Sequence, residues 1–120
     1  MTLIGCTAMA AIASAPAMAT DNGAQPTTAG YEAIVAGDMA TAEIEIASLS
    51  ETLARDPAHL INAGFVHWQA GRLTEARQAF LAARDHRRHY LIETADGSVA
   101  DTRAVASRAL ARLQNSLALR

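Results

Sequence analysis

The fold is decided by residues 60–80, LINAGFVHWQAGRLTEARQAF. An earlier stretch, residues 26–46, PTTAGYEAIVAGDMATAEIEI, matches them at small and apolar positions. The two stretches are offset by 34 residues, so that Gly30 recurs as Gly64. The other matched positions are Ala36-Gly37 with Ala70-Gly71, Ala42 with Ala76, Tyr31 with Phe65, Ile34 with Trp68, and Ile46 with Phe80. A fixed period of this length is typical of proteins built from repeated helical hairpins.

Each stretch carries the pattern of two helices separated by a glycine. Apolar spacing predicts a first helix from about Thr28, which Gly37-Asp38 ends, and a second helix that starts near Met39 and ends before Pro57. Asp56-Pro57 is a helix entry signal, with Asp at the N-cap and Pro at the first helical position. Gly71-Arg72 then ends the third helix. A fourth helix opens at Leu73 and extends to Tyr90 or Ile92 at most.

The small residues of the second stretch have a packing role. Gly64 and Ala76 allow two helices to approach closely, and Phe80 fills the space beneath them. The motif Leu60-x-x-Ala63-Gly64-x-x-His67, followed by Ala76-x-x-x-Phe80, resembles a tetratricopeptide repeat. The first copy, Pro26-x-x-Ala29-Gly30-x-x-Ala33 followed by Ala42-x-x-x-Ile46, keeps the small residues and loses the aromatic ones. His67 and Ala33 stand where that family prefers Tyr.

No third copy follows, because both glycines are lost at the corresponding positions. Asp96-Gly97-Ser98 predicts a turn, and residues 98–118 predict one amphipathic helix with Arg103, Arg108 and Arg112 on its outer side. Repeat arrays need a terminal cap with a polar outer face. We therefore expect an all-α fold of five helices, with two tetratricopeptide-like αα-hairpins at residues 28–94 and a capping helix within residues 95–120. The alternative is a pair of plain helical hairpins without a tetratricopeptide superhelix.

The first residues have the character of a targeting segment. Residues 3–19 carry no charge and end in Ala17-Met18-Ala19, which fits the small-x-small rule for signal peptidase. We expect a signal peptide at residues 1–19, cleavage after Ala19, a polar mature N-terminus at residues 20–27, and a periplasmic or secreted protein. The segment is too short and too Ala-rich to make a stable membrane span. Two alternatives are a lipoprotein anchored through Cys6, in a lipobox-like Leu3-Ile4-Gly5-Cys6, and an ordinary buried Ala-rich helix.

The composition argues against most chemical functions. The formal net charge is −2, so nucleic acid is not an expected partner. The chain shows no motif for a nucleophile, a phosphate loop or a dinucleotide, and we expect no enzyme activity, catalytic residue, cofactor or metal site. His86 and His89 could share a helix face, but Arg84, Arg87 and Arg88 would repel a cation there.

The resemblance to tetratricopeptide repeats implies a groove lined by the first helix of each pair. The groove residues it implies are Tyr31, Ile34, Ile61, Phe65, Trp68 and Gln69, with Thr27, Val35 and Ala58 beside them. In the other interpretation, the capping helix covers these residues and they are core. The expected function is a non-enzymatic protein- or peptide-binding module of the bacterial cell envelope. The alternatives are a structural subunit acting through homo-oligomerisation and a small-ligand or metal-binding periplasmic module.

Overall fold

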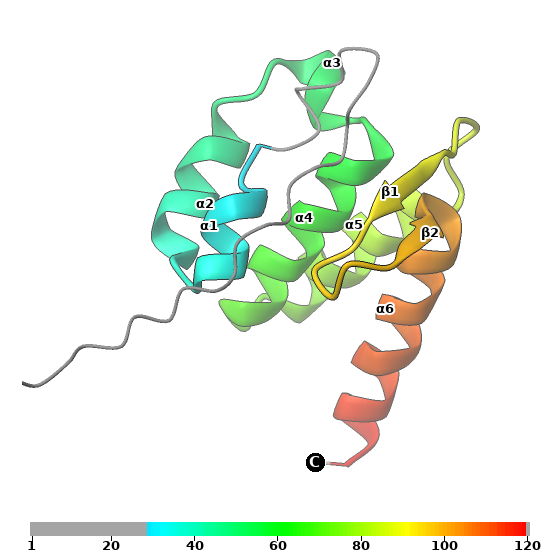
Figure 1. Cartoon of the computed structure of the whole chain (residues 1–120). Coiled ribbons are helices and arrows are strands. Elements are labelled where there is room, and N and C mark those ends of the chain that lie inside the picture. The colour runs from blue at the N-terminus through cyan, green and yellow to red at the C-terminus, as the bar shows by residue number, and fades with distance from the viewer. Residues whose placement is uncertain (1–28, 120) are drawn as a thin grey trace, which may run out of the picture.

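The computed structural model describes residues 29–119, which form six helices and one antiparallel two-stranded hairpin (Figure 1). The helices are α1 (Tyr31–Ala36), α2 (Met39–Ala47), α3 (Glu51–Ala54), α4 (Pro57–Gln69), α5 (Leu73–Arg84) and α6 (Thr102–Ala118), and the strands are β1 (Leu91–Glu93) and β2 (Val99–Asp101). This part of the chain is mostly helical, as expected. The predictions for the signal peptide, Ala19, Cys6 and Thr27 fall outside the described residues.

The main core lies between α4, α5 and α6. Gly64 of α4 faces Phe80 of α5 so closely that a Cβ atom on Gly64 would lie 2.7 Å from Cδ1 and 2.8 Å from Cζ of the ring. Phe80 and Ala76 are completely buried. Helix α6 packs mainly on α5 and also contacts α4, with Leu113 buried in the shared cluster. The close approach expected from the sequence at Gly64 is therefore present.

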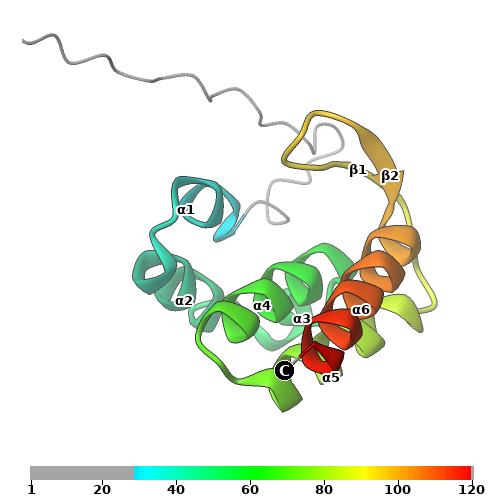
Figure 2. The ribbon, with the colours of Figure 1, turned by 90° about the horizontal axis from the view of Figure 1, so that it is seen from below.

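Helices α1 and α2 pack on the other side of α4, away from α6 (Figure 2). Their small cluster joins Ala33 and Ala42 to Val66 of α4. A Cβ atom on Gly30 would lie 2.9 Å from Cγ1 of Ile46, so this helix pair also meets at a glycine.

Two glycines end helices in the same way. Gly37 has a φ of 82° and Gly71 a φ of 81°, in the left-handed region that favours glycine. Each donates its N–H to a carbonyl three residues back at 3.0 Å, and the next residue, Asp38 or Arg72, donates to a carbonyl five residues back at 2.8 Å. Both bonds satisfy carbonyls at the end of a helix, as in the Schellman motif. The breaks predicted at these positions are confirmed.

The prediction of one continuous second helix from Met39 to a point before Pro57 was wrong. The helix ends at Ala47 because Ser48 turns its hydroxyl to the carbonyl of Glu45 at 2.7 Å. The Ser50 hydroxyl then accepts from the N–H of Leu53 at 3.3 Å and caps the separate short helix α3. The hydroxyls of these two serines bond to backbone groups and so divide the segment into two helices. The described residues therefore hold six helices instead of the five expected.

The C-terminal half also differs from expectation. Helix α5 ends at Arg84, well before Tyr90, because the following chain pairs with residues 98–102. The N–H of Thr94 donates to Ser98 at 2.8 Å, and the N–H of Thr102 donates to Tyr90 at 2.9 Å. The turn at Asp96-Gly97-Ser98, which the sequence did predict, closes this hairpin.

The C-terminal helix predicted as a cap is present as a helix, but it starts later than residue 98. It begins at Thr102 because the Asp101 carboxylate accepts from the N–H of Arg103 at 2.7 Å and so acts as its N-cap.

We expect Gly64→Ala to destabilise the protein by about 1–3 kcal/mol, because the added methyl group meets the Phe80 ring. Chemical denaturation measures the loss. The double variant Gly64→Ala, Phe80→Leu should lose less than the sum of its single variants, because the smaller side chain makes room. A Gly64→Ala variant as stable as the parent would contradict the close approach.

His59 is a buried titratable group near the start of α4, with 1% of its surface exposed. Its Nδ1–H donates to the carbonyl of Leu53 at 2.8 Å, while Nε2 has no hydrogen-bond partner among the described residues. Burial lowers the pKa of His59 below its ordinary value of 6.5, against the opposing effects of the Leu53 carbonyl and Asp56.

The unfolded chain therefore binds a proton at His59 more readily than the folded chain does. We expect the free energy of unfolding to fall as the pH drops below about 6.5, by at most about 1.4 kcal/mol per pH unit from this group. Urea denaturation at pH 7.5, 6 and 5 measures the slope. His59→Asn keeps a donor at the δ position for Leu53 but does not titrate, so its slope should be smaller. Equal slopes in the two proteins would refute the assignment.

Candidate binding groove

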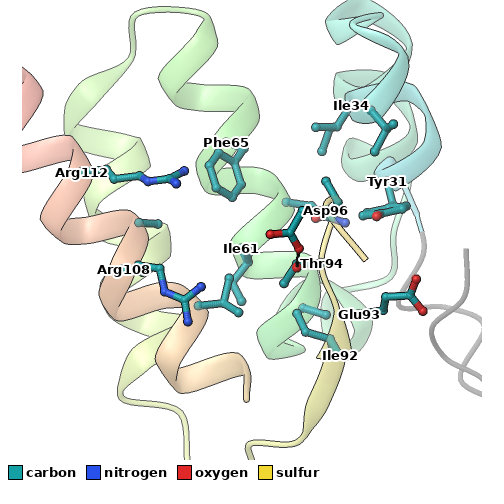
Figure 3. Close-up of a pocket in the computed structure, with 16 residues that line it drawn as sticks. Tyr31, Ile34, Ile61, Phe65, Ile92, Glu93, Thr94, Asp96, Arg108 and Arg112 are labelled. Carbon is teal, nitrogen blue, oxygen red and sulfur yellow. Dashed lines mark hydrogen bonds between the residues drawn. The ribbon is translucent and has the colours of Figure 1, made fainter. Parts of the chain in front are cut away.

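A groove of about 390 Å³ opens on the face of α4 that lies between α1 and α6 (Figure 3). Its floor comes from α4, chiefly Ile61 and Phe65, with Ile34 of α1 beside them. The hairpin contributes Ile92 and the residues of its turn, and α6 contributes Val105 with its neighbours. Four elements, which span most of the described residues, thus enclose an apolar floor. A pocket that is mostly apolar with few polar groups is the usual form of a binding site.

The structure brings most of the sequence-predicted groove residues together. Tyr31, Ile34, Ile61 and Phe65 line the groove, as do Val35 and Ala58.

Trp68 and Gln69 do not line the groove. Trp68 lies beyond Phe65 on α4 and packs on the main core, stacked with Phe65 at 6.2 Å between ring centroids and edge-on to Phe80 at 6.3 Å. Gln69 is exposed at the end of α4. The aromatic cluster therefore belongs to the core, and only Phe65 also faces the groove.

The capping helix forms one wall of the groove and leaves it open. Helix α6 lies mainly on α5, and from there Arg108 and Arg112 reach the groove. The sequence placed these two residues on the outer side of the helix. They are exposed, as expected, but their guanidinium groups point toward α4 across the groove floor (Figure 3). Their spacing of four residues along one helix was the signal that could have placed them on a common face.

The opposite wall carries negative charge that sequence reasoning missed. Glu93 of β1 and Asp96 of the turn both line the groove. The Asp96 Oδ1 atom accepts from the hydroxyl of Thr94 at 2.6 Å and from the hydroxyl and N–H of Ser98 at 2.7 and 2.9 Å. These bonds hold the pKa of Asp96 well below its ordinary value, so the carboxylate is ionised.

Tyr31 stands beside these acids at the α1 side of the groove. Burial raises its pKa, and the charges of Glu93 and Asp96 raise it further. Its hydroxyl therefore stays protonated at neutral pH and is available to donate a hydrogen bond.

Tyr90 ties the hairpin wall to the helix that makes the floor. Its hydroxyl donates to the carboxylate of Asp56, which also accepts from the N–H of Ala58 at 3.0 Å as the N-cap of α4. The Arg88 guanidinium lies over the Tyr90 ring, 5.7 Å from its centroid. One carboxylate thus fixes both the start of α4 and the base of the hairpin.

The two histidines considered as a metal pair lie beyond the end of α5 and share no helix face. The Nδ1 atom of His86 accepts from the N–H of Arg88 at 3.0 Å, and Nδ1 of His89 lies 2.7 Å from Oδ2 of Asp101. Between residues 29 and 119, no three His, Cys, Asp or Glu side chains gather as a metal site. Within the same range, no helix has the length and apolar character needed to cross a membrane.

Comparisons with protein-family models, with curated proteins and with solved structures found no match for this chain. The interpretation of the groove therefore rests on its own residues.

We expect Tyr90→Phe to loosen the hairpin wall, because it removes the hydroxyl bond to Asp56 and keeps the ring beneath Arg88. A loss of about 1–2 kcal/mol in the local stability of the hairpin corresponds to amide exchange that is roughly five- to thirtyfold faster there. Hydrogen exchange measured by NMR at the N–H groups of Thr94 and Thr102 tests this. The N–H of Ala42 in α2 serves as the internal control. Unchanged exchange at Thr94 and Thr102 would show that the bond does not hold the wall.

Proposed function

We propose that this chain is a non-enzymatic module of the bacterial cell envelope that binds a protein or peptide in the groove between α1, α4, α6 and the hairpin. The observation that carries the proposal is the apolar floor of Ile34, Ile61 and Phe65, which stays open between two charged walls. A buried aromatic anchor within a polar rim is the arrangement that dominates protein interfaces. The floor is built from helices, and its shape is therefore preformed.

A tetratricopeptide-like origin for the helix pairs is part of the same proposal. It is supported by contacts that recur 34 residues apart. Gly30 meets Ile46 as Gly64 meets Phe80, and Gly37 ends its helix with the same bonds as Gly71. In that family the first helix of each pair lines the groove, as α1 and α4 do in this chain.

Export to the cell envelope is supported by the sequence of residues 1–19. The proposal includes cleavage after Ala19 and a periplasmic or secreted mature chain, or attachment to the membrane through a lipid on Cys6.

A second candidate function is a structural subunit that acts by self-association. It is favoured by large apolar side chains that are exposed outside the groove: Ile44 and Leu91 are each 69% exposed, and Val99 is 62% exposed. Such side chains on a small protein are common at interfaces between subunits. Concentration-dependent sedimentation would reveal this function.

The binding function can be tested by selecting peptides from a random 12-residue library displayed on phage, with the full chain as bait. We expect Val35→Glu to weaken the selected peptides at least tenfold, because it places a charge in the apolar lining that α1 contributes to the groove, where the Val35 side chain is 45% exposed. Fluorescence anisotropy of labelled peptides measures the affinity.

Ile44→Glu is the matched control, because it makes the same kind of change on α2, away from the groove. It should leave peptide affinity unchanged. If the two variants weaken binding equally, or if no peptide is selected, the groove is not the binding site. Ile44→Glu would disrupt self-association if the second candidate function holds.

A further inference from the structure

The two long walls of the groove carry opposite charges. Arg108 and Arg112 lie on α6, and Glu93 and Asp96 lie on the hairpin. The apolar floor separates them, and no salt bridge of the described residues joins the two walls. The charges of the groove thus nearly cancel, but the positive charges lie on one wall and the negative charges on the other.

Arg108 and Arg112 differ from four other arginines of residues 29–119, which already have partners. Arg55 pairs with Glu51, Arg72 with Glu43, and Arg84 with Asp85. The guanidinium of Arg103 donates to the carbonyls of Arg84 and His86 at 3.2 and 3.3 Å. Arg108 and Arg112 have no acidic partner within this range, and both guanidinium groups point over the floor (Figure 3). Their donors are free to bind a carboxylate, which guanidinium groups recognise by paired hydrogen bonds.

The acids of the other wall do not move across to neutralise them. Asp96 is held by its bonds to Thr94 and Ser98, and Glu93 belongs to β1, where it pairs with Val99. Figure 3 shows the Glu93 carboxylate directed away from α6. The backbone of the hairpin therefore keeps the opposite charges apart.

We propose that the groove selects a peptide segment of one polarity: an apolar side chain on the floor, a carboxylate toward Arg108 and Arg112, and a cationic side chain toward Asp96 on the hairpin. This inference rests on the proposed function and names the chemistry of its partner. An apolar floor excludes water beneath the charges, which strengthens each interaction relative to one in open solvent. Because the charges differ in sign, a segment bound in the reverse direction would meet two like-charge contacts.

The same charges disfavour an anionic polymer or surface. A nucleic acid or an anionic lipid surface presents phosphate along its whole length, and the acidic wall would repel it. Only a ligand with separated charges of both signs satisfies the two walls together.

The test compares the peptides selected from the phage library by two charge-reversed proteins. The first carries Arg108→Glu and Arg112→Glu. The control carries Arg77→Glu and Arg87→Glu, two exposed arginines that do not line the groove. Both variants change the net charge equally, and circular dichroism and thermal melting confirm that both are folded.

We expect the parent and the control to select similar peptides. These peptides should carry an apolar residue with Asp or Glu on one side of it and Lys or Arg on the other. The Arg108, Arg112 variant should lose this preference for an acidic residue and gain basic residues instead. Replacing the acidic residue of a selected synthetic peptide by Gln should weaken it at least fivefold with the parent and less than twofold with the Arg108→Gln, Arg112→Gln variant.

Two other results would overturn the inference in different ways. If peptides bind, and Val35→Glu weakens them, but both charge-reversed proteins select the same peptides, the charge selection is refuted and the proposed function stands. If no groove-dependent peptide is selected by any protein, the proposed function fails together with this inference.

Discussion

The structure depends on the contact between Gly64 and Phe80. The absence of a side chain at Gly64 lets α5 approach α4 closely enough for the Phe80 ring to be completely buried. That ring is the largest fully buried side chain of the described residues, and Phe65 packs against it edge-on at 5.2 Å. In a chain this poor in aromatic residues, much of the large apolar volume of the core thus depends on one position without a Cβ atom.

Helix α6 packs on the helix pair that this contact joins. Ala83 of α5 and Ala106 and Ala109 of α6 are buried in the same core cluster as Phe80. Small residues on both helices allow close packing, so α6 docks mainly on α5 and reaches α4 only at its edge. Ile61 is buried and Phe65 is half-buried where they line the groove beside α6. The groove thus lies next to a tightly packed helix pair.

The features that could be predicted from the sequence are those encoded by adjacent residues. The left-handed glycines Gly37 and Gly71, and the Asp56-Pro57 helix start, act within one turn of the chain. The division of the second helix depended on the hydroxyls of Ser48 and Ser50, which a pattern of apolar residues does not reveal. The hairpin was missed because strands of three residues show no periodicity, and their pairing joins segments on either side of a turn.

The same distinction explains the candidate site. The resemblance to tetratricopeptide repeats pointed to Ile61 and Phe65 of the floor, but it also included Trp68, which packs on the core. The charged walls depend on tertiary position. Arg112 lies over the floor because α6 docks on α5, and Asp96 faces it because the Tyr90 hydroxyl anchors the hairpin to Asp56. Local sequence patterns therefore determine which residues each helix can bury. The arrangement of charges around the groove depends instead on the tertiary contacts between helices and the hairpin.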